Sequence, residues 1–349
     1  MPKESKPSRL GLGCYPLGGG YGKVDENEAQ RTVDAALDAG WTFMDTAEAY
    51  LVSEERLGEI LTGRRNRVFL ATKAFPSEPY TYENLRVAVE SSLRRLQTDH
   101  IDLYQLHGPQ DWVITFDSIP TYEEVADSLN RLRDSGKILN IGVCNLPTGI
   151  IKKIHERIGL YSTQNLYSMI DRGAEKDPLH LPVEREIIPY AHKHGLRFIS
   201  FSPLSRGLLA DGLDPSRTFG PEDERHYLPR YAPEFYTAYV KLAHSLEAWA
   251  RDHGHSLVEL AVAWTLKTPG VTNTLIGAKR PEQVQAVVGA KDWYLDDGDC
   301  AEIDAIIAEL PEGAWNAKMI VWDHFDPAAL EGMRQRRHNT SKLAPDSSH

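Results

Sequence analysis

The chain has 349 residues, of which 41% are hydrophobic and 26% are charged, a composition typical of globular proteins. Its net charge of -11 argues against nucleic acid or an anionic membrane surface as a general partner, although a local basic pocket for a phosphate stays possible. No apolar run approaches the roughly 20 residues that span a bilayer, and the first six residues lack the apolar core of a secretion signal.

Cysteine and histidine usage gives no indication of a metal site. Cys14, Cys144 and Cys300 are odd in number, far apart and without metal-ligand spacing. We expect reduced, packed thiols, which fits a cytoplasmic protein. Two histidine pairs, within residues 192–194 and 253–255, lie at predicted helix ends, where such side chains commonly cap carbonyls. We therefore predict no metal.

The first predicted strand leads into a glycine-rich rim loop. A dinucleotide fingerprint of the form GxGxxG does not fit, because its third glycine would fall on Pro16. Tyr15 and Tyr21 could instead face a ligand. Asp25 is expected to cap the helix that follows.

Seven further apolar strands alternate with predicted helices. They are expected near residues 42–45, 68–73, 101–107, 138–145, 161–166, 197–202 and 274–277. This alternation is typical of an α/β fold of the (β/α)8, or TIM, barrel type. We predict a single barrel domain over residues 1–338, with long rim loops at 108–120 and 203–233 and an extra C-terminal helix at 301–310. Residues 339–349 are expected to form a disordered polar tail.

Polar side chains end three successive predicted strands. Asp45 ends one strand with Tyr50 five residues later, Lys73 ends the next, and His107 ends the one after. The C-terminal ends of parallel barrel strands meet at one rim, so these four residues should converge. A neighbouring ammonium would lower the pKa of the phenol, the carboxylate would hold that ammonium charged, and the imidazole could orient a carbonyl oxygen. Such a set could protonate a carbonyl oxygen while hydride reaches its carbon.

These residues resemble the aldo-keto reductase family over about residues 10–288. The segments that carry the resemblance are Asp-Thr-Ala-x-x-Tyr at 45–50, Ala-Thr-Lys ending at 73, Ile-Asp-Leu-Tyr-Gln-Leu-His ending at 107, Ile-Gly-Val-Cys-Asn at 141–145, Gln-Asn-Leu-Tyr-Ser from 164, Phe-Ser-Pro-Leu-Ser-Arg-Gly from 201 and Ile-Gly-Ala-Lys-Arg-Pro-Glu-Gln from 276. The resemblance implies an NADPH-dependent reductase of aldehydes and ketones. In it Tyr50 would be the acid, Lys73 and Asp45 its tuning pair, and His107 the group that orients the carbonyl.

The resemblance also implies a cofactor site. Asn145 and Gln164 would hold the nicotinamide carboxamide, to which an amide offers both a donor and an acceptor, and Phe201 would stack on the ring. Lys279 and Arg280 could meet a 2′-phosphate as charged donors, so NADP is favoured and NAD remains possible. The other expected cofactor-binding residues, several of which would wrap the pyrophosphate, are Cys144, Ser202, Pro203, Leu204, Ser205, Arg206, Gly207, Leu208, Gly277 and Gln283.

Three places depart from the family pattern. Cys144 stands where serine is usual, Leu166 where many relatives have glutamate, and residues 286–287 are Ala-Val where Glu-Asn is frequent. The resemblance thus predicts altered contacts at both ends of the cofactor.

Tyr15 and Trp112 could offer stacking faces to a carbonyl or sugar-like small-molecule substrate. One alternative is a reductase of a nucleotide-linked keto or enoyl sugar, for which the sequence has no distinct diphosphate motif. Another is a non-catalytic NADP(H)-sensing subunit, which the complete set of four catalytic residues disfavours. A barrel hydrolase using His107 is disfavoured because no nucleophile elbow is present. The sequence leaves the oligomeric state open.

Overall fold

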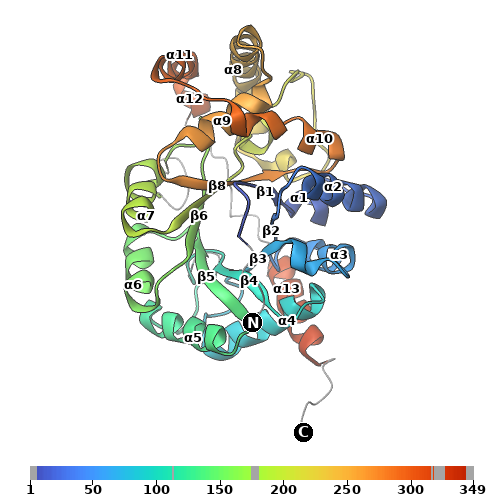
Figure 1. Ribbon diagram of the computed structural model, residues 1–349, viewed down its shortest axis with the longest axis vertical. Helices are drawn as coiled ribbons and strands as arrows, with labels where there is room; N and C mark the ends of the chain where they lie inside the picture. The colour runs from blue at the N-terminus through green and yellow to red at the C-terminus, as the bar shows by residue number, and fades with distance from the viewer. Residues whose placement is uncertain (1–5, 112–113, 174–180, 316, 318–326, 343–349) are drawn as a thin grey trace.

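The computed structural model describes residues 6–111, 114–173, 181–315, 317 and 327–342. Eight parallel strands close into a barrel in sequence order, and each strand pairs with both neighbours, including the first with the last (Figure 1). They are β1 (Leu10–Gly13), β2 (Phe43–Asp45), β3 (Phe69–Ala74), β4 (Ile101–Leu106), β5 (Ile138–Cys144), β6 (Ser162–Leu166), β7 (Arg197–Phe201) and β8 (Val271–Gly277). The predicted (β/α)8 barrel is confirmed.

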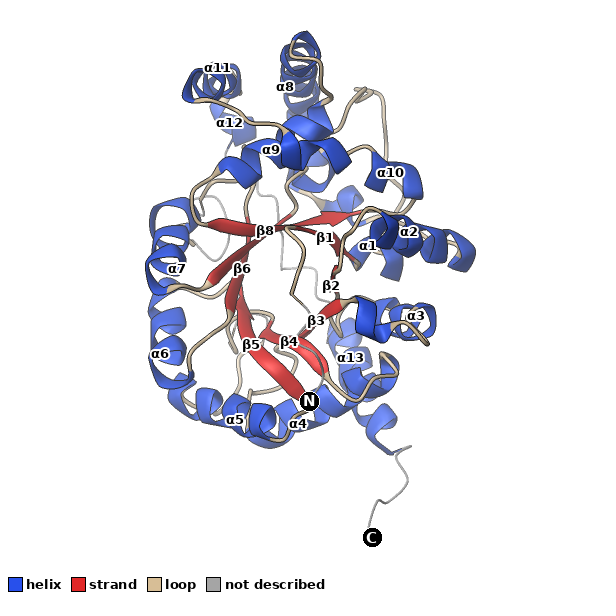
Figure 2. Cartoon of the chain, in the orientation of Figure 1, coloured by secondary structure: helices blue, strands red, loops and turns tan. Residues whose placement is uncertain are grey.

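Helices lie outside the strands, as Figure 2 shows. The α-helices of the described residues are α1 (Tyr15–Gly18), α2 (Glu26–Asp38), α3 (Ser53–Ile60), α4 (Tyr82–Arg95), α5 (Tyr122–Asp134), α6 (Thr148–Ile158), α7 (Ile188–His194), α8 (Pro233–Asp252), α9 (Leu257–Lys267), α10 (Pro281–Gln285), α11 (Asp297–Ala308), α12 (Glu312–Trp315) and α13 (Pro327–Lys342). Asp25 caps α2 as predicted, since its carboxylate accepts hydrogen bonds from the backbone amides of Asn27 and Glu28. The rim loop expected at 203–233 contains three short 3-10 turns.

The barrel interior explains why polar groups meet at one rim. A small apolar cluster, separate from the larger core between strands and helices, is formed by Phe43, Phe69, Ala71, Leu103, Ile199 and Leu275. Side chains two residues apart on a strand point to the same face. Asp45, Lys73 and Gln105 each lie two residues beyond a member of this cluster, so they point inward at the C-terminal ends of β2, β3 and β4.

The C-terminal helix α13 was not predicted. It packs beside α4, and the Ser91 hydroxyl on α4 donates to the backbone carbonyl of Arg337 at 2.7 Å. The helix also continues to Lys342, past the position where the polar tail was expected to begin. Its approach brings residues far apart in sequence to the edge of the barrel rim.

Candidate active site

Asp45, Tyr50 and Lys73 form one hydrogen-bonded group at the barrel rim. The Lys73 ammonium is completely buried and pairs with the Asp45 carboxylate. It also donates to the Thr46 carbonyl at 2.8 Å and to the Tyr50 hydroxyl at 3.3 Å. The convergence expected from the strand ends is therefore present for these three side chains.

Burial and charge act against each other on the pKa values of this group. Burial alone would lower the pKa of Lys73, but the Asp45 carboxylate reverses that effect and the net pKa is raised. For Tyr50, burial outweighs the nearby Lys73 ammonium and raises the pKa to about 12. We expected Lys73 to lower the phenol pKa; it does act in that direction, but the net shift is upward because the ring is desolvated. Tyr50 is thus fully protonated at neutral pH.

His107 follows β4 and lies beside the phenol. Its ring centroid is 5.6 Å from that of Tyr50, and its Nδ1 is buried without a hydrogen-bond partner among the described residues. Burial, reinforced by the Lys73 charge, holds the pKa of His107 well below 6.5, so the imidazole is neutral. A neutral imidazole next to a protonated phenol can offer two hydrogen-bond donors to one oxygen atom.

Gln105 belongs to the group and was missed in the sequence. Its side-chain amide donates to Asp45 Oδ2 at 3.2 Å, and the Gln164 amide donates to the same oxygen at 2.9 Å. With Lys73 on the other oxygen, the buried carboxylate has partners on both sides. A polar residue two positions before His107, next to the buried Leu106 near the end of the strand, was the available signal.

A cavity of about 1200 Å³ opens from this group. Its wall includes most of the predicted site: Tyr15, Asp45, Tyr50, His107, Cys144, Asn145, Gln164, Phe201, Ser202, Pro203, Leu204, Arg206, Gly207, Gly277, Lys279, Arg280 and Gln283. Lys73, Ser205 and Leu208 do not line it. Lys73 lies behind Tyr50, the Ser205 hydroxyl donates to Asp171, and Leu208 is buried in the apolar core. Trp112 lies outside the described residues.

The cavity wall carries a set of basic residues. They are Lys23, Arg206, Arg217, Arg225, Lys279, Arg280 and Arg336, of which Lys23, Arg217, Arg225 and Arg336 were not predicted. Arg206 pairs with Glu224, and Arg225 pairs with Asp223. Burial and then the nearby Arg225 charge lower the pKa of Lys279, although Asp223 opposes them. The basic residues on this wall outnumber the carboxylates that pair with them.

Several backbone positions on the cavity wall have the left-handed conformation that non-glycine residues seldom adopt. The φ angles are 52° at Asn145, 55° at Ser202 and 58° at Arg206. Such angles cost of the order of 1–3 kcal/mol each and persist only where surrounding contacts enforce them. Asn145, Ser202 and Arg206 all line the cavity.

A sequence model described as the Aldo/keto reductase family matches residues 9–308. The chain belongs to this family. It is 34% identical over 313 residues to the aldo-keto reductase YhdN of Bacillus subtilis, covering 86% of this chain and 90% of that protein. It is 27% identical over 326 residues to L-galactose dehydrogenase of Arabidopsis thaliana, covering 89% of this chain and 93% of that protein.

Solved structures show the same likeness. The glycerol dehydrogenase of Gluconobacter oxydans superposes with a TM-score of 0.75 at 29% identity, covering 93% of this chain and 96% of the other. An aldo/keto reductase of Klebsiella pneumoniae, solved in complex with NADP and acetate, superposes with a TM-score of 0.65 at 26% identity. The superposition covers 88% of this chain and 93% of the other. The expected family is confirmed, and this chain is an oxidoreductase of the aldo-keto reductase type.

The departures from the usual aldo-keto reductase sequence all fall on or near the cavity. Cys144 is buried and lies 3.6 Å from the side-chain oxygen of Gln164, and burial raises its thiol pKa to about 12. Leu166 is buried at the end of β6. Ala286 and Val287 line the cavity without polar side chains. Polar contacts at this end therefore fall to the basic residues and to Gln283.

The cysteines and histidines have ordinary surroundings. All three cysteines are free, with Cys14 and Cys144 buried and Cys300 partly exposed. His255 contacts Glu259, and His253 contacts the Trp249 carbonyl. No group of three or more potential ligands gathers within the described part of the chain. In the same residues, no helix combines the length and apolar character needed to cross a bilayer.

Proposed function

We propose that this aldo-keto reductase interconverts a small carbonyl compound and its alcohol with NADP(H), using Tyr50 as the proton donor. The observation that carries the proposal is the position of the Lys73–Tyr50 hydrogen bond beside His107, at a cavity whose wall also carries basic residues. When bound, the cofactor supplies hydride to the carbonyl carbon. Proton transfer is then left to the chain's own residues.

The donor set of the cavity fits a phosphorylated dinucleotide. Asn145 and Gln164 line the end near Tyr50 and can bind a carboxamide, while Phe201 offers a flat face beside them. On the same cavity wall, Lys279 and Arg280 are available to phosphate oxygens as charged donors. Relatives support the choice of cofactor, because one from Schizosaccharomyces pombe is named for NADP(+) and the Klebsiella structures contain NADP or NADPH.

Proton transfer follows from the protonation states of the rim. Tyr50 is protonated and can donate to a carbonyl oxygen, with His107 as a second donor that orients it. As the phenolate forms, the Lys73 ammonium at 3.3 Å stabilises its charge, and Asp45 keeps that ammonium in place. The reverse reaction uses the same phenolate as a base.

A sugar-like or polyol substrate fits this rim best. The Tyr15 ring stands edge-on to Tyr50 at 5.0 Å and lines the cavity, so it can cover one face of a bound substrate. Two relatives are named as dehydrogenases of glycerol and of L-galactose. The buried free thiols support the expected cytoplasmic location, which remains part of the proposal.

The test is NADPH oxidation with glyceraldehyde and a panel of aldoses and ketones. Tyr50→Phe should lower kcat by about 100-fold or more, because only the proton donor is lost. Binding of NADPH, followed by tryptophan fluorescence, should be unchanged in the variant. Equal turnover in Tyr50→Phe would contradict the assignment of the proton donor.

A further inference from the structure

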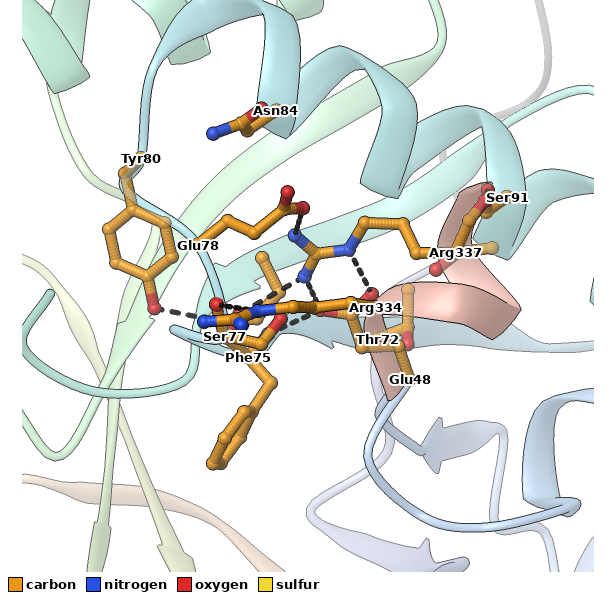
Figure 3. A network of polar contacts seen from close by, with 12 residues as sticks. Glu48, Thr72, Phe75, Ser77, Glu78, Tyr80, Asn84, Ser91, Arg334 and Arg337 are labelled. Carbon is orange, nitrogen blue, oxygen red and sulfur yellow. Dashed lines mark hydrogen bonds and ion pairs between the residues drawn. The ribbon is translucent and has the colours of Figure 1, made fainter. Parts of the chain in front are cut away.

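Arg337, on the C-terminal helix α13, has its guanidinium buried among carboxylates and carbonyls (Figure 3). Its side chain is 4% exposed. The guanidinium pairs with both oxygens of Glu48, and it also donates to Glu78 at 3.0 Å and to the Phe75 carbonyl at 3.1 Å. A forked guanidinium can satisfy this many acceptors at once, whereas an ammonium cannot.

Glu48 lies inside the loop that carries Tyr50, two residues before the phenol. Its backbone amide donates to the Lys73 carbonyl at 3.3 Å, and its carboxylate accepts from the Phe75 amide at 2.6 Å. The carboxylate is 7% exposed. Without Arg337 it would be a buried charge with one backbone partner, which is unfavourable enough to displace the loop.

Phe75 provides the second connection. Its peptide groups are fixed on both sides, because Glu48 accepts from its amide and Arg337 donates to its carbonyl. The Phe75 ring packs edge-on against His107 at 5.7 Å, and the His107 amide donates to the neighbouring Ala74 carbonyl at 2.9 Å. One guanidinium therefore joins the loop that carries Tyr50 to the segment after β3, whose Phe75 ring packs against His107.

We propose that Arg337 is a positioning residue that sets the distance between Tyr50 and His107 through Glu48 and Phe75. The inference rests on the proposed function of Tyr50 and His107. The C-terminal helix then contributes to catalysis without its Arg337 side chain touching the substrate.

A purely structural role, in which Arg337 only anchors α13, makes a different prediction. The helix has other attachments, including the Arg334 contact with the Ser77 carbonyl at 2.7 Å and the buried side chain of Leu330. If anchoring were the whole role, Glu48, with two contacts to the guanidinium, and Glu78, with one, would both act through their hold on α13, and losing either would speed amide exchange in α13 rather than in the Tyr50 loop. Only Glu48, however, lies on the loop that carries Tyr50.

The test compares Glu48→Gln with Glu78→Gln in the full chain, with Arg337→Lys as a third variant. Each substitution to glutamine keeps the shape of one partner and removes its charge. We expect Glu48→Gln to lower kcat for glyceraldehyde reduction by about 10-fold or more, with Kd for NADPH within about twofold. In Glu78→Gln, both kcat for glyceraldehyde reduction and Kd for NADPH should stay within about twofold of the wild-type values. Arg337→Lys should resemble Glu48→Gln, because an ammonium does not reproduce the fork.

Amide hydrogen exchange gives a second measurement that needs no turnover. Exchange in residues 46–51 and 74–77 should be faster by about 10-fold in Glu48→Gln and unchanged in Glu78→Gln. Equal effects of the two glutamine variants, or unchanged kcat and exchange in Glu48→Gln, would overturn the proposal. If the wild type reduced none of the carbonyls, the proposed function would fail and the exchange comparison alone would decide on Arg337.

Discussion

The Lys73 ammonium lies 3.3 Å from the Tyr50 hydroxyl and 4.8 Å from the centroid of its ring, with no exposed surface of its own. The phenol and the ammonium are thus desolvated together, and each affects the other's ionisation. Burial has the largest effect on the pKa of the Tyr50 phenol, which rises to about 12. Lys73 limits that rise, so its charge matters most when Tyr50 has given up its proton.

Lys73→Met should lower kcat by about 100-fold or more, because the phenolate formed after proton transfer loses its counter-charge. It should also destabilise the fold by about 3–5 kcal/mol, since the Asp45 carboxylate is left buried without its partner. Lys73→Met combined with Asp45→Asn separates these effects. Urea unfolding should show stability regained in the double variant while kcat stays low. Recovery of kcat along with stability would contradict a catalytic role for the ammonium.

His107 should make stability depend on pH. Its folded-state pKa is held well below 6.5, so the unfolded chain binds a proton there before the native chain does. The stability that the protein gains by keeping His107 neutral is fully present above about pH 6.5. It is lost as the pH falls below that value. In that range the free energy of unfolding should drop by up to about 1.4 kcal/mol per pH unit more in the wild type than in His107→Gln. Urea unfolding from pH 7.5 to 5 measures this, and identical slopes would show that His107 is not buried as a neutral ring.

The sequence was most informative where chemistry coincides with strand ends. Asp45, Tyr50, Lys73 and His107 were predicted together because the barrel alternation places successive strand ends on one rim. Gln105 was not predicted with them, because a buried amide within a strand can hydrogen-bond to many kinds of neighbouring group. Only the fold shows that its partner is Asp45. The sign of the Tyr50 pKa shift was missed for a related reason. Desolvation depends on the packed surroundings, which residue types alone do not give.

Helix α13 was missed because its buried face is not an apolar stripe. Arg337 is one of its buried residues, and its partner Glu48 is 289 positions away in the chain. An arginine next to a polar tail is usually solvated, so the local sequence gave no reason to expect a buried helix before the disordered tail predicted from residue 339. The helix is held by charge pairing over a long sequence separation, which no periodicity within residues 327–342 reveals.

Lys279 and Arg280 on the cavity wall should discriminate between the two nicotinamide cofactors. Replacing Lys279 and Arg280 together by glutamine should raise Kd for NADPH by about 10-fold or more and Kd for NADH by about threefold or less, because only NADPH carries the 2′-phosphate. Lys279 also donates to the Tyr21 carbonyl, so the single variants should be measured as well. Lys291→Gln, outside the cavity and paired with Asp292, is the control. Parallel losses for both cofactors would mean that the pair does not read the 2′-phosphate.

Gln105→Met should weaken the hold on Asp45 without changing any charge. The carboxylate would keep Lys73 and the Gln164 amide but lose one of two donors to Oδ2, so we expect kcat to fall by about threefold to tenfold. Gln105→Glu should be far more damaging, because it buries a second carboxylate next to the first. It should lower the free energy of unfolding as well as kcat. The informative measurement is the alkaline limb of the kcat–pH profile, since a less firmly held Asp45 constrains the Lys73 ammonium less and should shift the apparent pKa of Tyr50. An unchanged profile and kcat in Gln105→Met would show that Gln164 and Lys73 are sufficient to hold Asp45.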